Sequence, residues 1–224
     1  MISVRNLSKR FQGKNALEEI NFELAAGSRT AISGPSGSGK TTLLRLLAGL
    51  ELPDQGEVHL DGILASRPGW ALAPHLRHIG MVFQSPALWP HMTLAENIMF
   101  GLAGYAKSEA RDRLAELLDF CALQGLENRY PDQISGGEAR RAALARALAP
   151  DPDILLMDEP LTNLNPELKD DLLALIHRVT GAVVTLIYVT HERREAEYLC
   201  QEIWTLRRGK LYKNPAILEE QGAL

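Results

Sequence analysis

A glycine-rich stretch between a short apolar segment and a helical pattern constrains the fold of this chain more than any other feature. Residues 34–41 read Gly-Pro-Ser-Gly-Ser-Gly-Lys-Thr, between an apolar run at 30–33 and a helical pattern at 41–50. Glycines let the backbone curl until its N–H groups point at phosphate oxygens, and the following helix adds its positive end. A lysine and a threonine at this spacing suit contacts with the β- and γ-phosphates and with Mg²⁺. The stretch predicts a phosphate-binding loop, and the alternative is a plain glycine-rich turn.

Two further apolar runs, at 154–157 and 183–189, also end in polar residues. Short continuous runs of this kind suit parallel strands that are buried on both faces. Helical patterns follow two of the three runs, at 41–50 and 166–179. We therefore expect an α/β fold with a parallel sheet and with functional residues at the carboxyl ends of its strands.

The opening of the chain has a different pattern. Segments 2–4, 20–24 and 57–60 look like strands joined by turns, with no crossover helix between them. This pattern predicts a small antiparallel β subdomain beside the parallel sheet.

The middle of the chain, about 86–149, is rich in Ala, Leu, Glu and Arg at helical spacing. We expect it to form a helical subdomain inserted into a core made of about 1–85 and 150–224. The whole chain, 1–224, would then be a single domain, which suits its length of 224 residues.

Composition narrows the function classes. The formal net charge is −4, so the chain lacks the basic footprint of a nucleic-acid binder. Its two cysteines, Cys121 and Cys200, have no Cys-x-x-Cys spacing, which indicates a reducing compartment and no disulfide framework. No apolar run approaches the roughly 18 residues of a membrane helix, and the N-terminus lacks the apolar core of a signal peptide. Any membrane role is expected to come through a partner.

Two acids, Asp158 and Glu159, directly follow the apolar run at 154–157. An acid at this place can hold the Mg²⁺ shell, and a second acid can orient and polarise an attacking water. Alone, Asp-Glu-Pro is most often a plain turn. With a phosphate loop in the same sheet, the catalytic interpretation is favoured and the chain reads as a P-loop nucleotidase.

Residues 134–138, Ile-Ser-Gly-Gly-Glu, open another helical pattern. Ser135 and Glu138 have the spacing of a capping box, with Ser135 as the N-cap. Two glycines just inside a helix cost stability compared with alanine, so they suggest that something approaches the backbone closely. A γ-phosphate at this positive helix end would fit, and a mere helix start is the alternative.

The same residues closely resemble the signature motif of ATP-binding cassette (ABC) proteins, and the resemblance extends over nearly the whole chain in the family's order. It implies an ATPase subunit of a membrane transporter. Each ATP would lie between the phosphate loop of one copy and the signature helix of a second copy. On this resemblance Phe11 stacks on adenine, Gln84 senses Mg²⁺ and the γ-phosphate, and His191 contacts the γ-phosphate.

The resemblance implies a full set of site residues. The implied catalytic residues are Lys40, Glu159 and His191. The implied Mg²⁺ ligands are Thr41, Gln84 and Asp158. The implied ATP contacts are Phe11, Gly34, Pro35, Ser36, Gly37, Ser38, Gly39, Lys40, Thr41, Thr42, Gln84, Ser135, Gly136, Gly137 and Glu138.

The chain departs from the family pattern at two positions. Glu138 stands where the signature usually ends in glutamine. It caps a helix as well as glutamine does, but it adds a negative charge that would weaken ATP-driven closure if it pointed inward. Asn165 stands where the family usually has aspartate. Asparagine is an equally good N-cap ahead of Pro166, so the helix start is expected to persist without that charge.

Segment 77–93 and the triplet 129–131, Arg-Tyr-Pro, are similar to importer subunits for sugars, polyamines, iron and inorganic anions. The implied partners are an integral-membrane permease, an extracytoplasmic solute-binding protein and a second copy of the chain, and no nucleic acid. The implied location is cytoplasmic, on the inner face of the cell membrane. The alternatives are a cassette of an export or non-transport complex, and a GTPase, which would need an Asn-Lys-x-Asp motif that this sequence lacks.

Segment 86–92 places Trp89 among other apolar residues between two prolines. It is too short for a long buried helix, so its side chains either pack under the helical subdomain or lie exposed. We favour exposure, because exposed apolar patches mark binding sites and the family receives a short permease helix here.

A few other residues have simpler interpretations. His75 and His78 have no third ligand at a sensible spacing, so they are expected in a surface loop and not at a metal. Trp204 is expected to pack in a strand. Three arginines of the helix after the signature are expected to be solvated or paired with acids, namely Arg140, Arg141 and Arg146.

Overall fold

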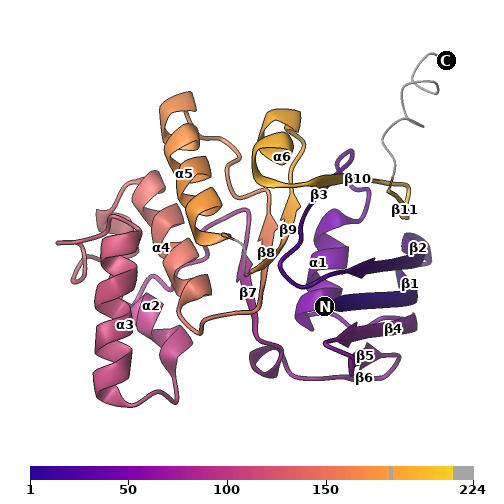
Figure 1. Cartoon of the computed structure of the whole chain (residues 1–224), viewed down its shortest axis with the longest axis horizontal. Coiled ribbons are helices and arrows are strands. Elements are labelled where there is room, and N and C mark those ends of the chain that lie inside the picture. Colours follow the sequence, from indigo (N-terminus) through magenta and orange to yellow (C-terminus); the bar gives the residue numbers. More distant parts are fainter. Residues whose placement is uncertain (182–183, 214–224) are drawn as a thin grey trace.

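The computed structural model describes residues 1–181 and 184–213. Over these residues the chain forms a five-stranded sheet, in the order β2-β1-β4-β5-β6, and a six-stranded sheet, in the order β11-β10-β3-β9-β8-β7. Figure 1 shows the first sheet at one end of the molecule and three helices at the other end, with the second sheet between them.

The antiparallel sheet confirms the small β subdomain that the opening segments predict. In β2, buried and exposed side chains largely alternate, as expected for a strand with one face on the core, whereas β1 begins with three buried residues in a row. Both strands run far beyond the short apolar segments, because polar residues on the exposed face interrupt those segments in the sequence. The strands of this sheet are β1 (Ile2–Phe11), β2 (Lys14–Leu24), β4 (Gln55–Leu60), β5 (Ile63–Arg67) and β6 (Trp70–Ala71).

The second sheet confirms the α/β fold. Five of its strands are parallel neighbours, and only β11 (Lys210–Tyr212) pairs in the antiparallel sense, with β10. The expected start of one strand, residue 183, lies outside the described residues. Trp204 is 2% exposed in β10, so its expected role in strand packing is confirmed. The parallel strands are β3 (Arg29–Ser33), β7 (Ile79–Val82), β8 (Ile154–Asp158), β9 (Thr185–Val189) and β10 (Glu202–Arg207).

Three helices follow parallel strands. The first, α1 (Lys40–Ala48), ends two residues before the sequence pattern does, because Gly49 caps it in the left-handed conformation. The second, α5 (Pro166–Val179), has the bounds that the sequence predicts, and the side chain of Asn165 accepts a hydrogen bond from the Leu168 N–H over 2.9 Å. The third is α6 (Arg193–Leu199).

The remaining helices are α2 (Leu94–Met99), α3 (Lys107–Phe120) and α4 (Gly136–Leu148), which lie side by side in Figure 1. They fall within the segment that we assign to the helical subdomain. Single 3-10 turns occur at Pro74–Leu76, Phe100–Leu102 and Pro131–Gln133.

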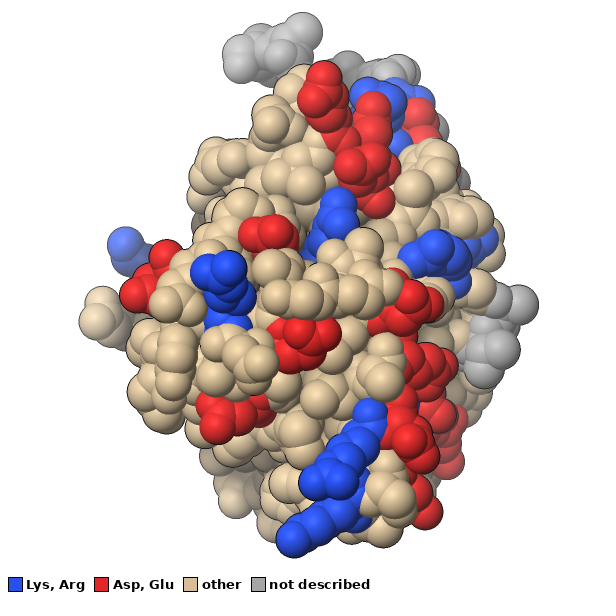
Figure 2. Space-filling model, turned by 90° about the vertical axis from the view of Figure 1, so that its left-hand side faces the viewer, with Lys and Arg blue, Asp and Glu red and all other residues tan. Residues whose placement is uncertain are grey.

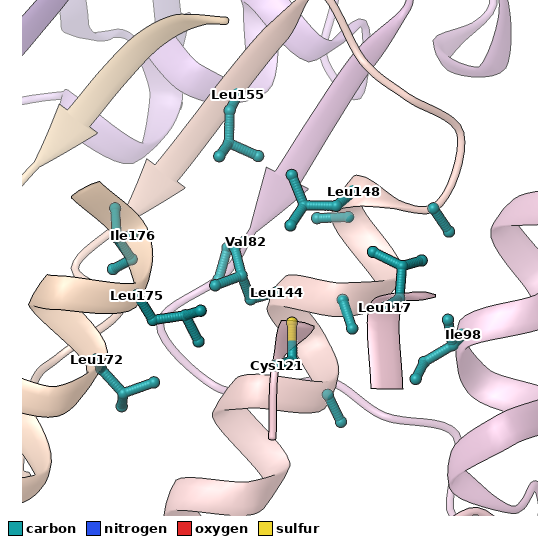
Figure 3. Close-up of a cluster of buried hydrophobic side chains, with 14 of the residues drawn as sticks. Val82, Ile98, Leu117, Cys121, Leu144, Leu148, Leu155, Leu172, Leu175 and Ile176 are labelled. Carbon is teal, nitrogen blue, oxygen red and sulfur yellow. The ribbon is translucent and has the colours of Figure 1, made fainter. Parts of the chain in front are cut away.

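One apolar cluster joins these helices to the parallel sheet. Figure 3 shows Val82 of β7, Leu144 of α4 and Leu172 of α5 around a common core, and all three side chains are buried. Cys121 is also in this cluster, and burial raises the pKa of its thiol to about 12. Both cysteines are free. The apolar contacts hold α4 against the strands that carry the candidate site.

The surface over the three side-by-side helices carries both signs of charge. Figure 2 shows acidic side chains in a band near several basic ones, with uncharged surface between them. No helix within the described ranges, 1–181 and 184–213, is long and apolar enough to span a bilayer.

Candidate functional site

The phosphate loop has a backbone that only glycine can follow at two positions. Gly34 has φ 148° and Gly39 has φ 109°. A Cβ atom at Gly34 would lie 2.0 Å from the Leu206 carbonyl oxygen, and one at Gly39 would lie 2.4 Å from that of Ala16. The loop is therefore pressed against β10 and the β1–β2 hairpin. Gly37, at φ 76°, faces open space.

Lys40 lies between this loop and the end of β8. Its Nζ donates to the carbonyl oxygens of Gly34 and Pro35 over 2.8 and 3.1 Å, and it lies 3.6 Å from Oε1 of Glu159. The side chain is 7% exposed, so its charge is shielded from solvent on most sides. It is placed to meet any anion that enters the loop.

A cavity of about 250 Å³ opens at the loop. Strands β7 and β8 are parallel neighbours with Val82 opposite Met157, so the residues that follow them reach the same edge of the sheet. The lining residues are Ala16, Ser36, Gly37, Gly39, Lys40, Thr41, Thr42, Gln84, Asp158 and Glu159. The structure thus brings together most of the residues that the sequence assigns to phosphates and metal.

One residue of the phosphate loop outside the cavity lining and one residue of the lining fit a bound anion and a cation. The Ser38 hydroxyl is buried and has no hydrogen-bond partner within the described chain. Asp158 is 6% exposed, and burial raises its pKa, although a hydrogen bond with the side chain of Thr41 acts in the opposite direction. A buried carboxylate of this kind is stabilised when a cation lies beside it.

Glu159 and His191 meet beside the same cavity. Oε2 of Glu159 lies 3.5 Å from Nδ1 of His191, which follows β9. The backbone of Glu159 has φ 47°, a left-handed conformation that residues other than glycine rarely adopt. Its N–H donates to the Val189 carbonyl oxygen over 2.9 Å. Such local strain is held by the surrounding structure and often occurs at functional sites.

A buried network that the sequence analysis missed fixes the loop that carries His191. Oε2 of Glu195 accepts hydrogen bonds from the hydroxyls of Thr190 and Tyr188, over 2.6 and 2.9 Å. Its Oε1 lies 3.2 Å from Nζ of Lys169 on α5. In the sequence, the signal of this network is Tyr188, because a tyrosine in a fully buried strand needs a hydrogen-bond partner for its hydroxyl.

The signature residues form a capping box. The Ser135 N–H donates to Oε2 of Glu138 over 2.6 Å, and the Glu138 N–H donates to the Ser135 hydroxyl over 3.3 Å. At Gly137 a Cβ would lie 2.7 Å from Leu168 of α5, so what approaches this glycine closely is a side chain of the same chain. At Gly136 a Cβ would meet nothing within 4 Å. Of the two signature glycines, Gly136 is the one that leaves space for a ligand.

Several expected ATP contacts lie apart from the cavity. The residues that line it do not include Ser135, Gly136, Gly137 or Phe11. Phe11 ends β1 with 46% of its surface exposed, and Nζ of Lys9 lies 5.2 Å from the centre of its ring. Within one described chain, these residues and the phosphate loop do not form a single pocket.

The expectation for two of the three α4 arginines is wrong. The Arg140 guanidinium donates to the carbonyl oxygens of Gln84, Pro160 and Thr162, and Arg146 donates to those of Pro86 and Ala87. Backbone carbonyls replace the acids because α4 lies against two loops whose carbonyl groups point toward it. Arg141 does approach an acid, with Nη2 at 3.9 Å from Oδ2 of Asp171. His75 and His78 are exposed.

Segment 86–92 is neither wholly buried nor wholly exposed. The centre of the Trp89 ring lies 4.3 Å from the centre of the Phe100 ring. The Arg146 guanidinium lies 4.9 Å from the centre of the Trp89 ring. Leu88 packs against the apolar cluster. Trp89, Phe100 and Arg146 help to line a groove of about 330 Å³ that β7 borders through Gly80 and its neighbours.

Comparison with known proteins gives the family. The family model described as ABC transporter matches residues 17–162. The chain is 43% identical over 213 residues to the sulfate/thiosulfate import ATP-binding protein CysA of Thermosynechococcus vestitus, covering 94% of this chain and 62% of the relative. It is 44% identical over 221 residues to the Fe(3+) ions import ATP-binding protein FbpC of Pseudomonas fluorescens, covering 97% and 62%. The chain thus spans about three fifths of the length of these relatives.

A solved structure agrees with this assignment. The dimeric ATP-binding cassette MJ0796, in a post-hydrolysis state bound to ADP and Pi, matches with a TM-score of 0.83 and 31% identity. The match covers 94% of this chain and 96% of that one. This chain belongs to the ABC transporter family and has the fold of its ATP-binding cassettes.

Proposed function

We propose that this chain is the ATP-hydrolysing subunit of an ABC importer, which binds and hydrolyses Mg-ATP and powers solute uptake through a separate permease. The observation that carries the proposal is one cavity lined by the phosphate loop, Gln84, Asp158 and Glu159. The relatives are named as import ATP-binding proteins, which supports the direction of transport.

The cavity residues fit ATP and Mg²⁺. The backbone N–H groups of the phosphate loop and the Lys40 ammonium would hold phosphate oxygens. Thr41, Gln84 and Asp158 would hold Mg²⁺, which supplies positive charge against the phosphates when it is bound. Phe11 would stack on the adenine, for which its exposed ring is available.

Glu159 would orient and polarise the attacking water. Its carboxylate lies at the edge of the cavity, between the Lys40 ammonium at 3.6 Å and the His191 imidazole at 3.5 Å. These neighbours fix the direction of the carboxylate, and a positioned carboxylate is an effective acceptor for a water proton. His191 would also contact the γ-phosphate, because its imidazole is 55% exposed and lies beside Glu159.

A second copy of the chain would complete the site. The signature helix begins with an open N-terminus at Gly136, and this end lies outside the cavity of its own chain. A helix N-terminus attracts phosphate oxygens through its free N–H groups. In a head-to-tail dimer, each signature helix would meet the ATP held by the phosphate loop of the other copy.

The permease would dock at the groove between β7 and the helical subdomain. Trp89 and Phe100 offer aromatic surface there, and Arg146 joins the groove to α4. Aromatic residues and arginine are the side chains that contribute most at protein interfaces. We further propose that an extracytoplasmic solute-binding protein belongs to the complex and that this subunit works at the inner face of the cell membrane.

Phosphate release from Mg-ATP by the purified chain tests this function. We expect turnover in the wild type, nearly none in Glu159→Gln with ATP binding retained, and a loss of nucleotide affinity in Lys40→Ala. Wild-type-like turnover in Glu159→Gln would refute the role of that carboxylate. Absence of Mg²⁺-dependent release in the wild type would refute the proposed function itself.

A further inference from the structure

The Arg140 guanidinium joins two loops that are far apart in the sequence, one after β7 and one after β8. Its Nη1 donates to the carbonyl oxygen of Gln84 over 2.9 Å and to that of Pro160 over 2.7 Å. Its Nη2 donates to the carbonyl oxygen of Thr162 over 2.7 Å. A planar guanidinium can hold several acceptors in fixed directions, which an ammonium cannot do.

Both loops carry part of the candidate site. Gln84 lines the cavity, and Pro160 directly follows Glu159, which also lines it. Thr162 closes the same turn, because its N–H and its hydroxyl both donate to the Glu159 carbonyl oxygen. Arg140 itself lies one turn into the signature helix α4.

Apolar packing does not explain this arrangement by itself. A small cavity of about 20 Å³ lies at the meeting point of the loops, lined by Arg140 with Val82, Pro86, Met157, Pro160 and others. Side chains beside a void lose contacts that would otherwise fix them. The guanidinium therefore adds directed polar contacts between the two loops at this point, and its burial lowers its pKa.

The signature helix α4 also holds the far end of the loop that begins at Gln84. Arg146 donates to the carbonyl oxygens of Pro86 and Ala87, over 2.9 and 2.7 Å. The segment that runs from Gln84 to the proposed permease groove is thus fastened to α4 at both ends.

We propose that Arg140 is a positioning residue, which locks the Gln84 loop and the Glu159 turn to the signature helix so that the three move as one unit. The inference rests on the proposed function, because its role is to place Glu159 and Gln84 for ATP hydrolysis. Arg140 does not touch the cavity, so it acts through the backbone of these two loops.

The test compares Arg140→Met with Arg141→Met on the same helix. Methionine keeps much of the side-chain length and removes every donor, and Arg141 contacts only Asp171, at 3.9 Å, among the ion pairs of the described chain. We expect Arg140→Met to lower kcat for ATP about tenfold or more with KM within about twofold, because misplaced catalytic groups cost rate more than binding. Arg140→Lys should restore little, and Arg141→Met should behave like the wild type.

Hydrogen exchange of the amides in residues 84–89 and 159–162 gives a readout without nucleotide. We expect faster exchange there in Arg140→Met, and wild-type exchange in Arg141→Met. If Arg140→Met does not fold, Arg140→Gln serves in the same comparison. Unchanged kcat and unchanged exchange would overturn the proposal, and so would equal effects in Arg141→Met. If the wild type does not hydrolyse ATP, the proposed function fails while the exchange experiment still decides the role of Arg140.

Discussion

The Glu138 carboxylate accepts a hydrogen bond from the backbone N–H of Ser135, the residue that caps the N-terminus of α4. This bond is the main reason why the pKa of Glu138 lies below its ordinary value of 4.5. The charge that distinguishes this signature from the usual glutamine is therefore directed at the chain's own helix end, where it is stabilising.

Glu138→Gln should leave ATP affinity within about twofold of the wild type, because the carboxylate already has its partner. The lowered pKa means that this carboxylate stabilises the fold above its ordinary pKa and that the contribution is lost as the pH falls through the lowered value. We expect the variant to be less stable by about 0.5 kcal/mol at pH 7, with the difference shrinking as the pH falls through the lowered pKa of Glu138. Urea unfolding over this pH range measures it, and markedly tighter ATP-dependent dimerisation would show that the carboxylate faces the triphosphate instead.

Gly136→Ala should separate stability from function. A Cβ there meets nothing within 4 Å, and alanine is the better helix former, so stability should be unchanged or rise by a few tenths of a kcal/mol. The added methyl group would stand where the partner's ATP is proposed to lie, so ATP-dependent dimerisation should weaken. Gly137→Ala is the contrast, because its methyl group would overlap Leu168 and lower stability. A Gly136→Ala variant that dimerises like the wild type would argue against a ligand at this helix end.

Trp89→Ala tests the groove. The ring contacts Phe100 and Arg146, so its removal should cost about 1–2 kcal/mol of stability without unfolding the chain. The ATPase of the isolated subunit should change little, while transport by the reconstituted complex should fall. Trp70→Ala is the matched control, because Trp70 is 43% exposed on β6. Equal loss of transport in both variants, or unfolding of Trp89→Ala, would move the docking surface elsewhere.

Arg77→Met should be the most destabilising of these changes. The buried guanidinium donates to the carbonyl oxygens of Leu46 and Leu47 at the end of α1, and to Ala65 and Ser66 of β5. Losing a buried cation with several acceptors should cost about 3 kcal/mol. Arg67→Met is the control, because Arg67 lies on β5 and is exposed. If Arg77→Met lowers the free energy of unfolding in urea less than Arg67→Met does, this role of Arg77 is contradicted.

The sequence predicts the two sheets and the phosphate loop because their signals are local. Glycines with special backbone angles, such as Gly34 and Gly39, and continuous apolar runs are visible within a few residues. The N-cap at Asn165 and the box at Ser135 are equally local, and both occur as expected.

The interactions that hold the site together could not be predicted in this way. Arg140 and Gln84 are 56 residues apart, and Arg77 and Leu46 are 31 residues apart. Their acceptors are backbone carbonyls, which every residue carries, so no pattern of side chains marks them. Glu195 is similar, because in the sequence it looks like an ordinary acid on the surface of a helix, whereas it is 3% exposed.

Light scattering of Glu159→Gln with and without ATP tests the central claim, that ATP is held between two copies of this chain. Slowing hydrolysis should preserve the closed state, and ATP should shift the population toward it because it binds that state better. We predict a monomer without ATP and a dimer with ATP, and a monomer under both conditions when Lys40→Ala is added. A monomer at every ATP concentration in Glu159→Gln would contradict the account.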